Sequence, residues 1–394
     1  MALMMGLLSG CSDAASPKPT DASSMAGGNG QGEEASASNS TEVLQVSAGN
    51  SHTCVVMGDH TVRCWGLGSG VPSDTAHSIS GLRGAVAVAA GSQHSCALMD
   101  DGTVRCWGVG GVADASQAGG SVTVSIADLT DVRKISAGEQ HTCALLSDGD
   151  VRCWGANSQG QVTGARAEDC MAGDFCSAPV TPVTGLPPIV DLAAGGTHTC
   201  ALDKTGNVWC WGSDFYGEVT DRKEELCPTG FEDSCSEPHP PTRLEAVSNA
   251  IQVDAGERNS CALLEDGTAR CWGANNGESS PQPGSSARAV YDVTDATSFS
   301  TGGLNTCVTL KDRSVRCWGA INSNLDGPAN DRALAALNDV IQLEAGGQHV
   351  CAVSANGTLR CWGLGGQRQV TGQLPKGCTG LEDACFFEVT QIQF

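Results

Sequence analysis

The strongest constraint on the fold is a phrase that occurs seven times along the chain. One copy reads HTCALLSDGDVRCWG at residues 141–155, with an Asp-Gly turn between two cysteines and Trp-Gly after the second cysteine. The seven copies occupy residues 47–68, 89–110, 136–157, 193–214, 254–275, 300–321 and 344–365. A repeat of this length indicates supersecondary units that bury their apolar faces against one another.

Each copy predicts about four short antiparallel strands. In the third copy these are DVRKISAG, HTCALL, DVRCWG and, in the linking region, APVTPVTGL at 178–186. Ser147-Asp148-Gly149 predicts a three-residue hairpin loop, because its glycine readily takes the left-handed conformation that such a loop needs. The first and sixth copies carry His60 and Arg313 at that place. We therefore expect different or looser turns there.

Seven sets of four strands predict an all-β fold, a seven-bladed β-propeller of four-stranded antiparallel blades. Residues 42–394 provide about 50 residues per blade, which is near the size of known propeller repeats. A solenoid of stacked strands is the alternative, but it would need polar caps at both ends. Val389 and Ile392 follow Cys385 at the spacing of an opening strand. We therefore expect residues 386–393 to pair with the first copy's strands and to close the ring, which removes open sheet edges.

Tryptophan and glycine recur once per copy and indicate structural roles. A periodic tryptophan is typical of the core between blades, and the glycine before each His-Thr-Cys fits a close backbone approach near the axis. The tryptophans are Trp65, Trp107, Trp154, Trp211, Trp272, Trp318 and Trp362. The glycines are Gly49, Gly91, Gly138, Gly195, Gly256, Gly302 and Gly346.

Twenty of the 21 cysteines form ten close pairs, which predicts disulfides and an oxidising compartment. In the hairpin of the third copy, Cys143 and Cys153 lie directly opposite each other, as a disulfide requires. Zinc is the alternative, since a histidine precedes the first cysteine by two residues in five copies, although Asn259 and Asn305 replace it in the others. The predicted pairs are Cys54–Cys64, Cys96–Cys106, Cys143–Cys153, Cys200–Cys210, Cys261–Cys271, Cys307–Cys317, Cys351–Cys361, Cys170–Cys176, Cys227–Cys235 and Cys378–Cys385.

The last three of these pairs lie in insertions that are rich in acidic residues. Their simplest interpretation is the stapling of loops, and the alternative is a rim that binds calcium or a partner. No loop shows the full ligand series of a calcium site. The candidate rim residues are Glu168, Asp169, Asp174, Glu232, Asp233, Glu382 and Asp383.

The N-terminal region predicts a lipid anchor followed by a tether. Residues 1–11 form an apolar run that ends in Leu8-Ser9-Gly10-Cys11 and resembles the lipobox of bacterial lipoproteins, so Cys11 is the predicted lipidation site. Residues 12–41 have almost no large apolar side chain and predict a disordered tether. The propeller is expected to span residues 42–394. The formal charge of −22 opposes binding to nucleic acid and to anionic membrane surfaces.

The pattern Ala-Gly-x-x-His-Thr-Cys-Ala-Leu, followed by Asp-Gly-x-Val-Arg-Cys-Trp-Gly, resembles the regulator of chromosome condensation repeat. It is similar in particular to the cysteine-paired form of exported bacterial proteins. The resemblance implies the propeller fold. The family's best-known member is a nuclear guanine-nucleotide exchange factor that binds chromatin. That activity is not expected here, because no basic nucleosome-facing loop is present and the predicted compartment holds no small GTPase.

No phosphate loop, zinc motif or nucleophile elbow is present in the sequence, and we assign no catalytic, cofactor or metal residue. The first hypothesis is a monomeric, lipid-anchored scaffold at the outer membrane or cell surface that binds a protein or a glycan. Its contact with the membrane would be through the lipid alone. The alternative is a hydrolase or lyase with its site in the central channel. Clustered, non-repeating acids or histidines in that channel would favour the alternative.

Overall fold

The computed structural model describes residues 41–68, 75–109, 123–165, 176–220, 238–274, 288–289, 293–303, 305–319, 334, 337–365, 368–371, 373 and 386–394. All of them belong to the unit Ser38–Phe394. Cys11, the signal segment 1–11 and nearly all of the tether 12–41 lie outside these residues, as do all seven acidic rim residues. Within the described part of the chain, no helix combines the length and the hydropathy that a membrane crossing requires.

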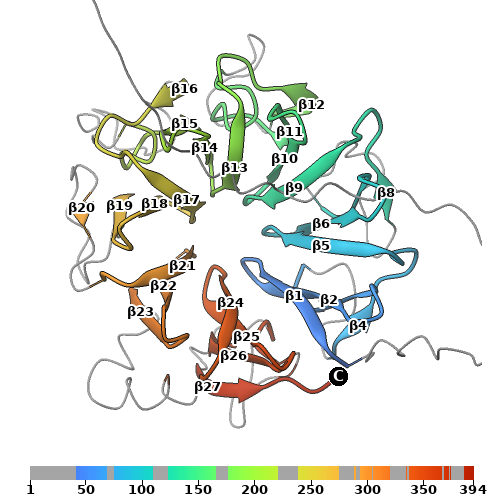
Figure 1. Cartoon of the computed structure of the whole chain (residues 1–394). Helices are drawn as coiled ribbons and strands as arrows, with labels where there is room; N and C mark the ends of the chain where they lie inside the picture. The colour runs from blue at the N-terminus through green and yellow to red at the C-terminus, as the bar shows by residue number, and fades with distance from the viewer. Residues whose placement is uncertain are drawn as a thin grey trace, which may run out of the picture. The chain divides into compact units, whose positions relative to one another are not determined.

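Seven antiparallel sheets surround a central axis and form the predicted propeller (Figure 1). The first blade comprises β1 (Val43–Ala48), β2 (His52–Met57), β3 (Val62–Gly66) and β4 (His77–Ser78). The second comprises β5 (Ala85–Ala90), β6 (His94–Met99), β7 (Val104–Gly108) and β8 (Val124–Ser125). The third comprises β9 (Val132–Ala137), β10 (His141–Leu146), β11 (Val151–Ala156) and β12 (Ser177–Pro182). The fourth comprises β13 (Ile189–Ala194), β14 (His198–Asp203), β15 (Val208–Gly212) and β16 (His239–Arg243).

The remaining three blades follow the same order from the axis outwards. The fifth comprises β17 (Ala250–Ala255), β18 (Asn259–Leu264), β19 (Ala269–Gly273) and β20 (Arg288–Ala289). The sixth has three described strands, β21 (Ala296–Thr301), β22 (Asn305–Leu310) and β23 (Val315–Gly319). The seventh comprises β24 (Val340–Ala345), β25 (His349–Ser354), β26 (Leu359–Leu364) and β27 (Phe386–Gln391).

The predicted pairing of the tail with the first copy is wrong. β27 pairs with β26 of its own blade, with Thr390 opposite Cys361. The reason is that the strand that links two copies is the outer strand of the blade before it. The first blade already has such an outer strand in β4, where His77 pairs with Cys64. The tail still reaches the first blade through its last residue, because the ring of Phe394 packs edge-on against Trp65 at 6.0 Å.

The expectation of looser turns in the first and sixth copies is also wrong. His60 and Arg313 have φ values of 59° and 64°, so they occupy the left-handed region that Gly149 takes with φ 94°. The backbone N–H of His60 donates to the Met57 carbonyl at 2.8 Å, and that of Gly149 donates to the Leu146 carbonyl at 3.0 Å. The flanking hydrogen bonds therefore hold one turn geometry, even where a side chain makes that conformation costly.

The seven predicted hairpin disulfides are confirmed. In each bridge the cysteines lie ten residues apart, with a Cα–Cα distance of 4.0–4.1 Å. Cys143 and Cys153 are paired in register, as the three-residue loop predicted. Of the three extra pairs, only Cys176 lies in the described part of the chain, and it is disulfide-bonded. The repeated tryptophans are core residues, and all but Trp318 are fully buried.

The repeated glycines form the narrow end of the central channel. A Cβ atom on Gly138 would lie 2.2 Å from the carbonyl oxygen of Gly195 in the next blade. The same clash recurs in every blade, between 2.1 and 2.6 Å, and includes the step from Gly346 back to Gly49 that closes the ring. Any larger residue would push neighbouring blades apart, so the ring of seven requires glycine at this place.

Candidate binding site in the central channel

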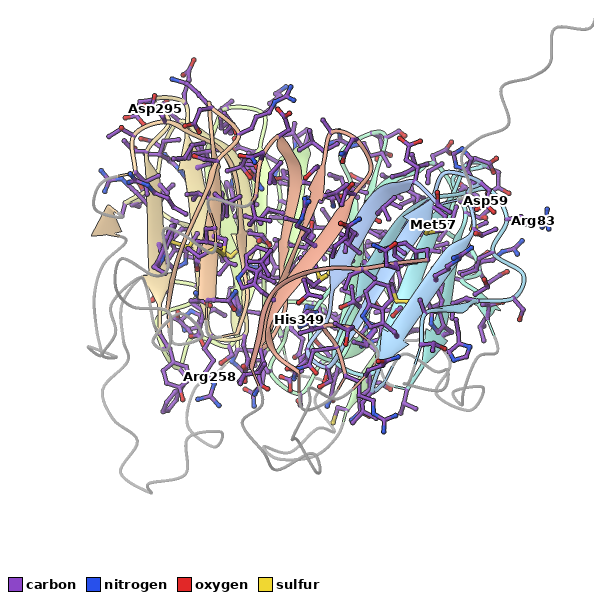
Figure 2. The ribbon with its side chains drawn as sticks, turned by 90° about the horizontal axis from the view of Figure 1, so that it is seen from below. Met57, Asp59, Arg83, Arg258, Asp295 and His349 are labelled. Atoms are coloured by element: carbon purple, nitrogen blue, oxygen red, sulfur yellow. A yellow bond between two sulfur atoms is a disulfide. The ribbon has the colours of Figure 1, made fainter. Side chains whose placement is uncertain are left out.

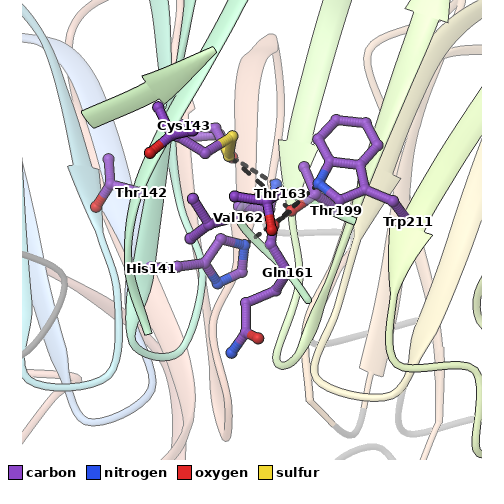
Figure 3. Close-up of a disulfide and its surroundings, with 12 residues drawn as sticks. His141, Thr142, Cys143, Gln161, Val162, Thr163, Thr199 and Trp211 are labelled. Atoms are coloured by element: carbon purple, nitrogen blue, oxygen red, sulfur yellow. Dashed lines mark hydrogen bonds between the residues drawn. A yellow bond between two sulfur atoms is a disulfide. The ribbon is translucent and has the colours of Figure 1, made fainter. Parts of the chain in front are cut away.

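The repeated histidines join each blade to the next. His141 on β10 lies 2.9 Å from the hydroxyl of Thr199 on β14, in the following blade (Figure 3). Thr199 donates to the carbonyl of Gln161 at 3.0 Å, and the indole N–H of Trp211 donates to the same carbonyl at 3.0 Å. Because the threonine proton is committed to that carbonyl, the histidine Nε2 must carry the hydrogen and donate to Thr199. Each interface between consecutive blades is called a seam below.

The seam that closes the ring has the same bonds as the internal ones. His349 of the seventh blade lies 2.7 Å from the Thr53 hydroxyl of the first blade. Thr53 and Trp65 both donate to the carbonyl of Gln369, at 2.7 and 2.9 Å. Closure therefore uses the repeat itself rather than an exchanged strand.

These histidines are structural rather than metal ligands. Burial lowers the pKa of His52 and His198 to about 4 and that of His141 to about 3, so all three are neutral at physiological pH. Their neighbouring cysteines are disulfide-bonded and offer no thiolate. Within the described residues, no group of three or more histidine, cysteine or acidic side chains is placed to hold a metal ion.

Two seams lack this histidine bond. Asn259 and Asn305 stand in the histidine place and are buried, each 3% exposed. The Oδ1 of Asn259 and both amide atoms of Asn305 have no hydrogen-bond partner among the described residues. Beyond Asn305, the seventh blade offers Val350 where other blades offer a hydroxyl. The seam between the sixth and seventh blades is therefore the least bonded at this position.

The inner strands line a polar channel with a volume of about 360 Å³. Side chains at the third place of these strands reach across to the next blade. Gln45 exchanges two hydrogen bonds with the backbone of Val88, at 2.8 and 3.0 Å. Gln342 does the same with Val46 across the closing seam, at 3.0 and 3.1 Å. These amides satisfy backbone groups at the exposed edges of the inner strands.

Besides Arg133, three charged side chains line this channel and break the repeat, namely Lys134, Asp254 and Glu344. Asp191 belongs with them through its contact with Lys134. Lys134 forms an ion pair with Asp191, which also accepts a hydrogen bond from the Val253 amide at 3.1 Å. Asp254 accepts from the Thr301 amide at 2.7 Å. Burial raises the pKa of Asp254 to about 6. Burial and the charge of Asp254 raise the pKa of Glu344 to about 8. Asp191 and Asp254 thus bond to the neighbouring blade, whereas the Glu344 carboxylate accepts a hydrogen bond from Gln342 of its own strand, at 3.2 Å.

A second group that breaks the repeat lies beneath the seam between the fourth and fifth blades. In the third blade, Asn157 accepts from the backbone of Val162 and Gln161 accepts from that of Gln159, both through side-chain oxygens. In the fourth blade, carboxyl groups take both places, as Asp214 and Glu218, which are 0% and 1% exposed. The sequence therefore replaces a neutral amide pair by a buried pair of acids.

This acid pair has shifted pKa values. Burial, reinforced by the charge of Asp214, raises the pKa of Glu218 to about 8, and burial also raises that of Asp214. The Nε2 of His239 lies 3.7 Å from an Asp214 oxygen. Arg258 stacks on Tyr216 and lowers the Glu218 pKa by its charge without restoring the ordinary value.

Sequence reasoning missed both the channel charges and the acid pair. Comparing the third and fourth copies would have found the pair, because Asn157 and Gln161 align with Asp214 and Glu218. The channel residues gave a weaker signal, since they stand at the third and fifth places of the inner strands, and these places vary among amide, charged and small residues. The structure brings the cysteines of each hairpin together as a disulfide, with the repeated histidine beside it. The acidic rim lies outside the described residues and stays a prediction.

Six segments of the chain match the family model for the regulator of chromosome condensation (RCC1) repeat. They are residues 43–69, 85–111, 132–161, 189–218, 250–277 and 340–369. The sixth blade is not among them. The chain thus carries RCC1 repeats, as its sequence pattern indicated.

Two similar proteins have matches limited to part of their length. The "Regulator of chromosome condensation" of Drosophila melanogaster is 32% identical over 96 residues, which cover 24% of this chain and 16% of the fly protein. The "Guanine nucleotide exchange factor SRM1" of Saccharomyces cerevisiae is 31% identical over 107 residues, 22% of each chain. The matches therefore span about a fifth of these relatives.

Two solved structures share the fold over most of their length. Prp20p from Saccharomyces cerevisiae, described with its binding to Gsp1p and histones, has a TM-score of 0.66 and 19% identity over 90% of this chain and 88% of that one. The ectodomain of the receptor kinase CR4 from Physcomitrella patens has a TM-score of 0.51 and 21% identity, with coverages of 82% and 73%. At these identities the likeness establishes the propeller architecture.

Proposed function

We propose, from the premise that this chain is a propeller of RCC1 repeats, that it is a scaffold that binds a protein partner outside the cytoplasm. In this proposal residues 1–11 are the signal segment with the lipid on Cys11, residues 12–41 are the tether and residues 42–394 are the binding domain. The outer membrane or the cell surface is the proposed location.

The observation that carries the proposal is the engagement of the repeated reactive groups in building the ring. The paired cysteines of each described blade form a disulfide. Five histidines lie within hydrogen-bonding distance of hydroxyl groups on the next blade. What remains free to differ between blades lies at the ends of the channel and in the insertions. Prp20p, with the same fold, is named for binding to Gsp1p and histones, which supports a protein as the class of partner.

The disulfides support the location. Seven bridges imply folding in an oxidising compartment, since cytosolic thiols are kept reduced. Alkylation followed by intact-mass measurement tests this. We expect no more than two free thiols among the 21 cysteines of the protein isolated from its cells. A larger number would remove the argument for export.

The lipid anchor has its own test. Cys11→Ser should move the protein from the membrane fraction to the soluble fraction, because the acyl chains could no longer be attached. A Cys176→Ser variant is the matched control, since it also loses one cysteine and should stay with the membrane. If the wild-type protein is itself soluble, the anchor is wrong and the scaffold proposal is unaffected.

Partner binding is tested by affinity capture from the cell surface with the full-length protein. A variant that lacks residues 168–175 and 223–237 removes two of the acidic insertions and keeps strands β12 and β16. Loss of the captured partners would assign binding to the insertions, and equal recovery would exclude these two as the binding rim. Failure of both proteins to capture any partner after crosslinking would overturn the scaffold proposal.

A hydrolase or lyase in the channel is the second candidate, because Asp254 and Glu344 are non-repeating acids with raised pKa values in a polar cavity. A protonated Glu344 near neutral pH has the form of a general acid. A panel of 4-nitrophenyl glycosides and esters tests this candidate. Turnover that Glu344→Gln abolishes would support an enzyme, and turnover that the substitution leaves unchanged would exclude this site.

A further inference from the structure

Every inner strand carries a β-bulge at its second residue. In the first blade the pairing with β2 passes from Val43 directly to Gln45, so that Leu44 is skipped. The same shift recurs in the other six blades. A bulge redirects the side chain of the extra residue away from the regular ladder. The seven skipped residues are Leu44, Val86, Arg133, Val190, Ile251, Thr297 and Ile341.

Five of these seven residues are large aliphatic side chains that face solvent. Single exposed apolar residues are common on any protein and need no explanation. Here, however, only six large hydrophobic residues of the described chain are exposed, and five of them occupy this one place. They are Leu44 (45% exposed), Val86 (44%), Val190 (42%), Ile251 (55%) and Ile341 (55%), and they are called the aliphatic ring.

The aliphatic ring surrounds the mouth of the channel opposite the glycine constriction. The inner strands that carry it encircle the axis in Figure 1. Their first residues lie at the end marked by the turns of Asp59 and Asp295 in Figure 2, and Arg258 marks the opposite end. The ring divides into two arcs, one on the seventh, first and second blades and one on the fourth and fifth. Arg133, which lines the channel cavity, and polar Thr297 separate the arcs.

An acidic collar lies around the ring. It consists of the residue before each inner strand and the three-residue hairpin loops, which together hold 11 acids and three bases. Two of the three bases are neutralised, since Lys311 pairs with Asp295 at 3.0 Å and Arg313 pairs with Asp339 at 3.4 Å. The acids of the collar are Glu42, Asp59, Asp100, Asp101, Asp131, Asp148, Glu265, Asp266, Asp295, Asp312 and Asp339.

The collar keeps its negative charge at physiological pH. Thr61 donates to the Asp59 carboxylate from its hydroxyl at 2.6 Å, and Thr103 does the same for Asp101. These side-chain bonds hold the pKa of both aspartates below the ordinary value. An apolar surface within a fixed negative field selects a ligand that combines apolar side chains with positive charge.

We propose that the aliphatic ring and its acidic collar dock a protein segment that presents apolar side chains among lysine and arginine. This rests on the proposed scaffold function and names the partner's chemistry. A second copy of the chain fits poorly, because its own collar would oppose charge of the same sign. Residues 12–40 fit poorly too, since they contain Asp13, Asp21, Glu33 and Glu34 against Lys18 alone. Anionic lipid is repelled for the same reason.

The test compares two variants of the full-length protein. Ile251→Ser with Ile341→Ser removes one side chain from each arc. Val109→Ser is the matched control, because Val109 is 53% exposed and is the sixth exposed hydrophobic residue, outside the ring. All three substitutions are at exposed positions, so melting temperature and disulfide content should match those of the wild type.

The probe is a synthetic peptide of leucine and lysine, with a leucine and glutamate peptide of equal length as its counterpart. We expect the cationic peptide to bind the wild type and the Val109→Ser control with equal affinity. Its affinity for the ring variant should be lower by about tenfold. Binding should also weaken as salt screens the collar. The glutamate peptide should not bind.

Three outcomes would overturn the proposal. They are equal binding of the cationic peptide by the ring variant, equal binding of the two peptides by the wild type, and a dimer in sedimentation that the ring variant abolishes. The last would make a second copy the occupant. If the ring variant still captures the cellular partners that the insertion-deleted variant loses, the scaffold function stands and the docking surface is elsewhere.

Discussion

The seam between the third and fourth blades and the seam between the sixth and seventh have the same geometry but different bonding. In the first, His141 donates to Thr199, and Thr199 donates to the carbonyl of Gln161. In the second, Asn305 stands in the histidine place opposite Val350, and both of its amide atoms lack a partner in the described part of the chain. The difference shows that the repeat residues act in pairs across a seam. Losing one member leaves the other buried without a partner.

The bonding difference coincides only in part with the family match, because the matched fifth blade also has an asparagine, Asn259, in the histidine place. The RCC1 repeat model matches six blades and omits the sixth, to which Asn305 belongs. A buried polar group without a hydrogen bond costs about 1–3 kcal/mol. We therefore expect stability to be unevenly distributed around the ring, with the lowest local stability at the sixth blade.

The largest effect should come from removing a histidine at a bonded seam. His141→Ala should lower the free energy of unfolding by about 3–4 kcal/mol, because it opens a buried cavity and leaves the Thr199 hydroxyl short of a donor. Asn305→Ala should cost less than about 1 kcal/mol, since it removes an amide that is already unpaired. Urea unfolding with the disulfides intact measures both. Equal losses would contradict the comparison.

A second comparison is between the fourth blade, which buries Glu218, and the third blade, which has the amide Gln161 at the same place. The pKa of Glu218 is raised to about 8 in the folded protein, above its unfolded value of about 4.5. The folded state therefore binds more protons than the unfolded chain across this window, so stability is lost as pH rises from 4.5 to 8. Glu218→Gln should leave stability unchanged near pH 4 and raise it by about 2–3 kcal/mol at pH 8.

The matched control for this pH effect is the reverse change in the third blade. Gln161→Glu places a carboxyl group in the corresponding buried position and should create a loss of stability between pH 5 and 8 that the wild-type blade lacks. Thermal unfolding at pH 4, 6 and 8 measures both variants. A pH-independent gain in Glu218→Gln would mean that repacking, rather than charge, is responsible.

Repairing the weak seam should give a smaller gain. Asn305→His together with Val350→Thr would rebuild the donor and the hydroxyl that other seams have, and should raise the free energy of unfolding by about 1 kcal/mol. Each single substitution should be neutral or destabilising, because it adds one polar group without its partner. A double-mutant cycle measures the coupling between them. Additive single effects would show that the pair does not interact.

The smallest effects should come from the hairpin turns. His60→Gly and Arg313→Gly should each stabilise the protein by about 0.5–1 kcal/mol, because glycine takes a positive φ without the clash of a Cβ atom. Gly102→Ala is the control in the opposite direction, since Gly102 has φ 77° and should lose a similar amount. A loss in the two glycine variants would show that the His60 and Arg313 side chains stabilise their turns by contacts.

Much of the fold followed from the sequence because its signals are periodic. Cysteines ten residues apart around a three-residue loop place Cys143 opposite Cys153 in register, and the structure confirms this. The glycine at the axis was predicted from crowding, and the close approach of Gly138 to Gly195 bears it out. Sevenfold recurrence made each local inference far stronger than a single copy would allow.

The wrong and missing predictions share a physical cause. Contacts between residues distant in sequence decide among structures that the local sequence pattern allows equally. The apolar spacing of Val389 and Ile392 marks a strand but does not say whether it belongs to the blade before or after it. The absence of glycine at His60 predicts another turn only if the flanking hydrogen bonds do not outweigh the strain. Lys134, Asp254 and Glu344 are far apart in sequence, and only the closed ring brings them to one channel.

The most direct test of the central claim is native-state hydrogen exchange compared between β22 and β10. These strands occupy the same place in their blades and differ in the seam residue, Asn305 or His141. We expect the amides of β22 (Asn305–Leu310) to exchange markedly faster than those of β10 (His141–Leu146), and Asn305→His with Val350→Thr to slow the exchange in β22. Equal protection of the two strands in the wild type would contradict this expectation.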